Sequence, residues 1–174
     1  MTLPLLKLAE TPGTEAREKA ERLYGVARAL LKRLMVEAFR GSDADGRWSM
    51  RDAYDALEAA QASDTLVPDD DPNPDWGPED EFADILAFEK ALPTQTYRSE
   101  HQVDMQQFST PAALSWLAAR AAAVTAGDHV LEPSAGTGML AARAIAAGAS
   151  ASLNERDPCR AALLSLVTGR PVTT

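Results

Sequence analysis

Residues 129–138 read HVLEPSAGTG. The first three residues predict a short apolar strand, and the Gly-x-Gly pattern of Gly136 and Gly138 predicts a tight turn directly after it. Because glycine has no Cβ, the backbone of such a turn can approach a ligand closely. The helix expected over residues 139–147 would direct its N-terminal amides toward that ligand. The stretch therefore predicts a strand, a ligand-binding turn and a helix.

The residues on either side extend this pattern. A second strand is expected near residues 150–153 and a second helix over about 158–167, while an alanine-rich helix is expected to precede the first strand from Thr110-Pro111 to about Val124. Strand, helix, strand, helix is the order with which a doubly wound, Rossmann-like sheet begins. The fold class expected is therefore α/β.

Two carboxylates suggest what the turn would bind. Glu155 lies just past the second predicted strand, where it could accept two hydrogen bonds from ribose hydroxyls. Glu132 would repel a pyrophosphate but could pair with a ligand ammonium group. No Gly-Lys-Ser/Thr follows the turn, and the third glycine of the dinucleotide fingerprint is missing. These features favour S-adenosylmethionine over NAD or ATP. In the alternative interpretation, Glu155 caps the helix expected near Pro158 and the glycines form an ordinary turn.

Three segments resemble parts of a known enzyme family. Residues 132–138 (EPSAGTG) resemble the cofactor loop of class I S-adenosylmethionine-dependent methyltransferases, and residues 154–158 (NERDP) resemble their ribose-binding segment. Residues 107–111 (QFSTP) resemble the element that precedes this loop in many N6-adenine DNA methyltransferases and packs over the cofactor. The order of the three segments also matches that group.

The resemblance implies a site for S-adenosyl-L-methionine that would be formed by the following residues: Gln107, Phe108, Thr110, Glu132, Pro133, Gly136, Gly138 and Glu155. For the first three of these residues, a role in helix capping or packing is favoured over contact with the cofactor. Upstream, residues 38–60 and 92–111 are similar to the amino-terminal region of methyltransferase–helicase proteins of the strawberry notch type. Such proteins are common on phages and plasmids, and some are linked to antirestriction. The similarity covers roughly residues 20–174.

An N6-adenine methyltransferase needs a second site, an Asn/Asp-Pro-Pro-Tyr/Phe loop after its fourth strand that contacts the flipped base. The sequence stops at Thr174, before a third strand is expected to begin, so the sheet is predicted to be a truncated Rossmann-like methyltransferase half-sheet. Residues 73–76 (NPDW) carry an amide and an aromatic ring, but Asp75 replaces the second proline. A solvated acidic turn is the favoured interpretation of this segment. The catalytic residues are therefore unknown, and methyl transfer by this chain alone is not expected.

The front of the chain differs in composition from the back. Residues 1–105 are predicted to form a helical region, and residues 106–174 a partial methyltransferase-like cofactor-binding unit. A first helix is expected over residues 14–40, with Gly41 as its stop. A second is expected to start from a cap at Ser49 and Asp52, with Tyr54 and Leu57 on its buried side. A third is expected from Pro78 to Pro93, and its inward residues would be Phe82, Ile85 and Leu86.

Residues 64–81 contain eight carboxylates, four prolines and no basic residue, which predicts an extended surface loop. The net charge of the 174-residue chain is −9, and neither half has the basic stripe of a free-standing nucleic-acid binder. A second hypothesis follows from this acidic run. It could imitate a nucleic-acid backbone and bind a host nuclease or a CRISPR component, as an anti-defence (antirestriction or anti-CRISPR) inhibitor derived from a methyltransferase.

Composition excludes several other classes of protein. The single cysteine, Cys159, cannot form an internal disulfide, and with only His101 and His129 besides, no metal site is expected. No apolar run approaches the ~20 residues that cross a bilayer. Residues 1–10 lack the basic leader and cleavage site of a signal peptide. A cytoplasmic location without a membrane partner is therefore expected.

Overall fold

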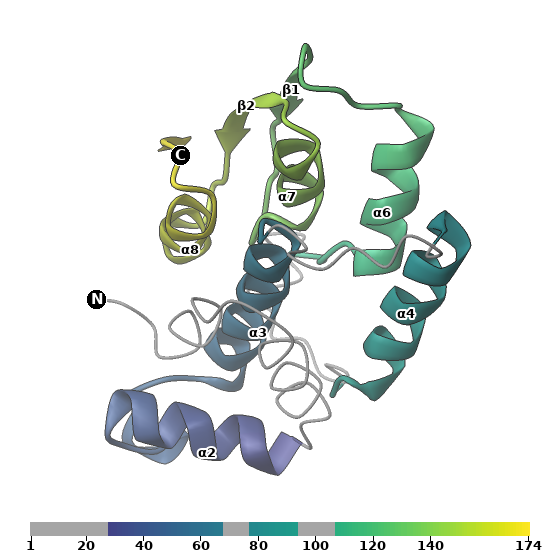
Figure 1. Cartoon of the computed structure of the whole chain (residues 1–174). Coiled ribbons are helices and arrows are strands. Elements are labelled where there is room, and N and C mark those ends of the chain that lie inside the picture. Colours follow the sequence, from purple (N-terminus) through teal and green to yellow (C-terminus); the bar gives the residue numbers. More distant parts are fainter. Residues whose placement is uncertain (1–27, 68–76, 94–106) are drawn as a thin grey trace. The chain divides into compact units, whose positions relative to one another are not determined.

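A computed structural model describes residues 28–67, 77–93 and 107–174 of the chain (Figure 1). These residues belong to two compact units. The first unit holds the described residues up to Leu57 together with 77–93, and the second holds residues 58–67 and 107–174. The boundary predicted between residues 105 and 106 lies outside the described residues.

Helices alone make up the first unit, whereas helices and parallel strands alternate in the second. The elements, in chain order, are α2 (Arg28–Phe39), the 3-10 helix η2 (Asp43–Asp45), α3 (Met50–Thr65), α4 (Pro78–Ala91), α6 (Ala112–Ala121), β1 (His129–Glu132), α7 (Met139–Ala146), β2 (Ser150–Asn154), α8 (Pro158–Thr168) and β3 (Val172–Thr173). The predicted α/β class is confirmed: a helical region precedes a small three-stranded parallel sheet with interleaved helices. Within the described ranges, no helix combines the length and the apolar character needed to cross a membrane.

The core of the first unit is built from α2, α3 and the segment between them. Its buried side chains are Leu31, Met35, Trp48, Ala53, Tyr54 and Leu57. The Trp48 indole Nε1 donates to the carbonyl oxygen of Gly41 at 2.8 Å, which satisfies the polar atom of a buried ring. The predicted burial of Tyr54 and Leu57 is confirmed.

Helix α2 ends slightly before its predicted stop. Arg40 adopts a left-handed φ of 51°, and the Gly41 amide donates to the carbonyl oxygen of Val36 at 3.3 Å, as in a Schellman ending. Gly41 is needed for close packing, because a Cβ at this position would lie 2.7 Å from Cγ of Arg47. Residues 14–27, the first part of the helix predicted over 14–40, lie outside the described residues.

A reciprocal cap starts α3, as the sequence predicts. The carboxylate Oδ2 of Asp52 accepts from the Ser49 amide at 2.7 Å and from the Ser49 hydroxyl at 2.8 Å. We expect Asp52→Ala to lower the free energy of unfolding by about 1 kcal/mol, because the cap loses both bonds. Urea unfolding followed by circular dichroism measures the change. Asp52→Asn keeps an acceptor oxygen and should lose less, so equal losses in the two variants would contradict this account.

The acidic run is helical at both of its ends. Asp64 lies in the last turn of α3, where the prediction of an extended loop from residue 64 is wrong, because the buried residues Ala59, Ala60 and Ala62 hold this part of α3 by packing. At the other end, α4 begins at Pro78, as predicted, with the Gly77 amide donating to Oδ2 of Asp80 at 2.9 Å. Residues 68–76 lie outside the described residues.

The residues of α4 that were predicted to face inward are half-buried. These are Phe82, Ile85 and Leu86. Phe88 in α4 and Leu92 directly after it pack against the core of the first unit. The helix ends at Ala91, and the predicted stop at Pro93 agrees with this boundary.

All strands of the second unit run parallel in the order β1-β2-β3. His129 pairs with Ser150, and Leu153 pairs with Val172. The expectation that the sequence stops before a third strand is wrong. The strand β3 was missed because two residues carry no periodic signal; it forms because the Glu155 amide donates to the carbonyl oxygen of Thr173 at 2.9 Å.

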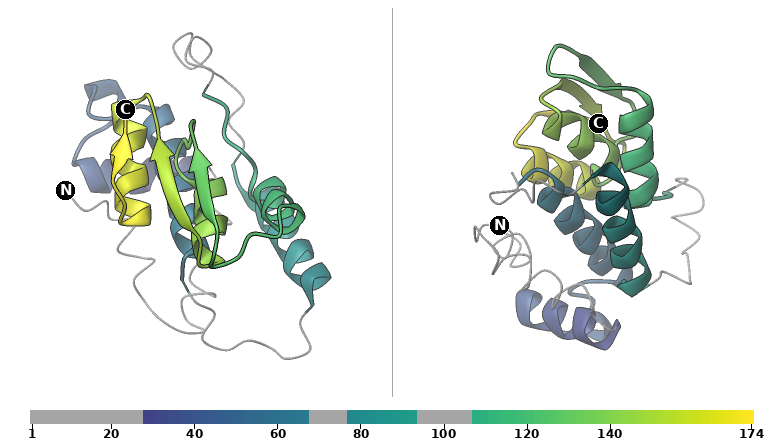
Figure 2. Two further views of the ribbon diagram at one scale, coloured as in Figure 1. Left: turned by 90° about the horizontal axis from the view of Figure 1, so that it is seen from above. Right: turned by 45° about the vertical axis from the view of Figure 1, so that its right-hand side comes forward.

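The two faces of the sheet differ in character. Helices α7 and α8 lie behind the strands in the left view of Figure 2, and the core on that side contains Ala135, Ala141, Leu153 and Leu164. The other face carries the exposed residues His129, Leu131, Ser150, Ser152 and Thr173. The His129 ring nitrogens lie 2.8 Å from the Ser150 hydroxyl and 2.9 Å from the Ser152 hydroxyl. The strands thus alternate, whereas strands of parallel sheets covered on both faces are near-continuously apolar.

Candidate functional site

The turn after β1 is bound to the segment after β2 at the carboxyl ends of these strands. The Ala135 amide donates to the carbonyl oxygen of Asn154 at 2.9 Å, and the Asn154 side-chain amide donates to that of Pro133 at 3.0 Å. The Gly136 amide donates to carboxylate Oε2 of Glu155 at 2.8 Å. Because ligands of open α/β sheets bind at this edge, the arrangement places the predicted turn where a ligand would lie.

The two carboxylate oxygens of Glu155 accept hydrogen bonds from the backbone of two segments, the glycine turn and the start of α8. Glu155 is 7 % exposed, and its second oxygen, Oε1, accepts from the Asp157 amide at 2.8 Å. Since a carboxylate can accept about four hydrogen bonds, each oxygen retains an acceptor site. Glu155 does not cap α8: Oδ1 of Asp157 accepts from the amides of Cys159 at 2.9 Å and Arg160 at 3.2 Å. The alternative interpretation of Glu155 as a helix cap is therefore wrong.

Residues 107–111 lie against the same region. Nε2 of Gln107 donates to Oδ2 of Asp157 at 2.9 Å, and Nη2 of Arg160 donates to the Ser109 hydroxyl at 3.0 Å. Phe108 is 56 % exposed. All three segments singled out in the sequence are thus linked by hydrogen bonds. Among the predicted cofactor residues of this segment, Thr110 is half-buried.

The two glycines of the turn have different surroundings. Gly136 has a φ of +59°, and a Cβ there would lie 3.5 Å from Nη2 of Arg160, so this glycine faces polar groups. Gly138 has a φ of +105°, and a Cβ there would lie 2.8 Å from Cδ1 of Leu164 in the core. Gly136 therefore lies on the polar side of the turn, and Gly138 allows α8 to pack against the turn.

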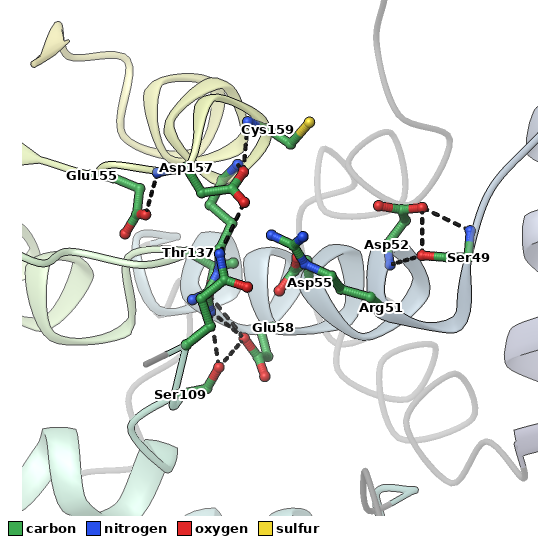
Figure 3. Close-up of polar contacts among 12 residues, drawn as sticks. Ser49, Arg51, Asp52, Asp55, Glu58, Ser109, Thr137, Glu155, Asp157 and Cys159 are labelled. Carbon is green, nitrogen blue, oxygen red and sulfur yellow. Dashed lines mark hydrogen bonds and ion pairs between the residues drawn. The ribbon is translucent and has the colours of Figure 1, made fainter. Parts of the chain in front are cut away.

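A polar cluster beside Gly136 contains residues that the sequence did not single out. Oε2 of Glu58, in the part of α3 that belongs to the second unit, accepts from Nη2 of Arg160 and from the Thr137 hydroxyl, both at 3.3 Å, and from the Ser109 hydroxyl. Figure 3 shows Glu58, Ser109 and Thr137 turned toward one another. Arg160 is 4 % exposed, whereas the Glu58 side chain is 23 % exposed. Ser109 and Arg160 lie within or beside the quoted motifs, but Glu58 has no local signal.

The remaining predicted residues lie as follows. Glu132 is half-buried at the end of β1, and Pro133 follows it in the turn. The upstream candidate for a catalytic loop, residues 73–76, and the acidic residues 69–71 lie outside the described residues. Within the part of the chain that is described, no three histidine, cysteine or acidic side chains gather as a metal site would require. The site thus offers acceptors, hydroxyl donors and one buried guanidinium, which are groups for binding a polar ligand.

No family model matches this sequence. Searches of curated proteins and of solved structures also find no match. The function is therefore inferred from the residues and from the geometry of the second unit.

Proposed function

We propose that the second unit is an S-adenosyl-L-methionine-binding, methyltransferase-like module of an N6-adenine DNA methyltransferase. Its sheet would be the first half of a Rossmann-like methyltransferase sheet. The observation that carries the proposal is the hydrogen bond between the Gly136 amide and the Glu155 carboxylate at the carboxyl ends of β1 and β2. A turn without a Cβ, beside a carboxylate with acceptor sites to spare, has the chemistry to receive a ribose.

The predicted residues would share the binding of this cofactor. Glu155 would accept hydrogen bonds from the ribose hydroxyls, and Glu132 would pair with the ammonium group of the methionine part. The exposed ring of Phe108 would pack on the cofactor. The bound cofactor would supply an activated methyl group, and the residues of this chain would bind and orient it. The proposal assigns no catalytic residue here, and contact with DNA would require a complete methyltransferase.

Calorimetric titration with S-adenosyl-L-methionine tests this proposal. We expect weak but measurable binding, abolished in Glu155→Ala, which removes the ribose acceptor, and in Gly136→Val, which fills the approach to the turn. Gly169→Val is the matched control, because Gly169 has a similar φ of +64° but a Cβ there would meet no atom within 4 Å. It should bear the same backbone strain and still bind.

Absence of heat at millimolar cofactor in the folded wild-type chain would overturn the proposal. Equal loss of binding in Gly136→Val and Gly169→Val would show that the loss reports general instability rather than ligand contact. The hypothesis of an acidic inhibitor would then be the remaining one. It depends on the acidic run, half of whose carboxylates lie in residues 68–76, outside the described residues, so it stays a prediction from the sequence.

A further inference from the structure

Three hydrogen-bond donors from three separate segments meet at one carboxylate oxygen. Oε2 of Glu58 accepts from Ser109 before α6, from Thr137 in the glycine turn and from Arg160 in α8. Glu58 and Arg160 are separated by 102 positions in the sequence. The donors therefore form a preformed carboxylate receptor, defined here as the Ser109 hydroxyl, the Thr137 hydroxyl and the Arg160 guanidinium.

We infer that this carboxylate receptor binds the carboxylate of an amino-acid-bearing ligand and that the Glu58 side chain occupies it as an internal competitor. The inference deepens the proposed function and rests on it. It names the group that would hold the methionine carboxylate of the cofactor. It also identifies an element that lowers the affinity of the site, carried on α3 rather than on the sheet.

The receptor is more deeply buried than the Glu58 side chain that occupies it. Arg160 and Thr137 are almost fully buried, at 4 % and 3 % exposure, so they are held in place by packing. The Glu58 side chain is 23 % exposed and can turn toward water, where its charge is solvated. When Glu58 turns away, a ligand carboxylate can accept the same charge-assisted hydrogen bond from Arg160.

The location of the receptor also fits the proposed ligand. The Arg160 guanidinium lies 3.5 Å from where a Cβ of Gly136 would be, and the amide of the same glycine donates to Glu155. The proposed ribose acceptor and the carboxylate receptor thus both lie beside Gly136. A ligand with both a ribose and an amino-acid group can bind to Glu155 and to the carboxylate receptor. Adenosine derivatives without a carboxylate can bind only to Glu155.

Titration of Glu58→Gln with two ligands tests the inference. The variant keeps the size of the side chain but removes the charge that competes for Arg160. We expect S-adenosyl-L-homocysteine to bind about tenfold more tightly than to wild type, the effect of a charge-assisted hydrogen bond. Binding of 5′-methylthioadenosine, which has the same nucleoside but no carboxylate, should not change. Glu37→Gln, an exposed change of the same charge on α2, is the control and should leave both affinities unchanged.

A second measurement separates this inference from the proposed function. Free methionine is added to wild type and to Glu58→Gln, and the amide resonances of Gly136 and Thr137 are followed by NMR. Shifts in the variant at concentrations that leave wild type unchanged support the receptor. If they occur while no adenosyl ligand binds either protein, the receptor stands and the proposed function fails.

The opposite result is equally clear. If wild type binds S-adenosyl-L-homocysteine and Glu58→Gln binds it no better, or gains equally for methylthioadenosine, the inference is wrong and the proposed function stands. Thermal unfolding shows whether Glu58→Gln folds. If it does not, Glu58→Asp replaces it, because a shorter carboxylate reaches the donors less well. That variant should bind S-adenosyl-L-homocysteine more tightly than wild type, and unchanged or weaker binding would overturn the inference.

Discussion

Gly138→Ala is expected to lower the free energy of unfolding of the second unit by about 3 kcal/mol. Two costs add at this position. The backbone φ of +105° is one that residues with a side chain rarely adopt, and the new Cβ would lie 2.8 Å from Cδ1 of Leu164. Leu164 is fully buried in the core under the sheet, so it has little room to move away. Chemical denaturation followed by circular dichroism measures the loss.

Gly169→Ala separates the two costs. Gly169 ends α8 with a left-handed φ of +64°, but a Cβ there would meet no atom within 4 Å. Its loss should be limited to the backbone cost of about 1 kcal/mol. If Gly138→Ala cost no more than Gly169→Ala, the close approach of the turn to α8 would not be a packing constraint. This prediction concerns stability alone and does not depend on any ligand.

Arg160→Met is expected to destabilise the unit by about 3 kcal/mol, because it removes the polar contacts of a guanidinium that packing holds in place. The ion pair between Nη2 of Arg160 and Oε2 of Glu58 spans 3.3 Å, and its arginine is almost fully buried. The variant also removes the hydrogen bond from Arg160 to the Ser109 hydroxyl. Thermal and chemical unfolding of the purified chain test the expected loss.

An exposed ion pair provides the matched comparison. Nζ of Lys32 lies 3.0 Å from Oδ2 of Asp43, but these side chains are 44 % and 38 % exposed. Lys32→Met should therefore cost much less than Arg160→Met. Equal losses in Arg160→Met and Lys32→Met would contradict the expectation that burial determines the cost.

Elements with strong local signals could be predicted from the sequence. The strands β1 and β2 and the helices α7 and α8 lie within one or two residues of their expected bounds. Each is marked locally, by an apolar run, by the glycines of the turn, or by Pro158 at a helix start. The strand β3 could not be predicted in this way. It contains two residues, and its identity as a strand depends on pairing with β2 rather than on its own sequence.

The candidate site was predictable to the same extent. Motif order placed residues 107–111, the glycine turn and Glu155 together, and hydrogen bonds join these segments. The role of Glu58 could not be predicted, because its partners are far away in the sequence and the residues around Glu58 form no motif. The helical conformation of residues 64 and 65 was missed for a related reason. Charge and proline content favour a loop there, but the packing of buried alanines maintains the helix.

The alternating strands have a consequence for what can cover the sheet. The face with His129, Ser150 and Ser152 is exposed, and its imidazole and hydroxyl groups bond to one another. Any additional layer laid over this face would have to replace lost water with hydrogen-bonding groups of its own, because buried polar atoms without partners are costly. A purely aliphatic helix would not meet that requirement. A layer on this side would have to combine hydrogen-bonding groups with an apolar contact for Leu131, whereas the opposite face packs against apolar side chains.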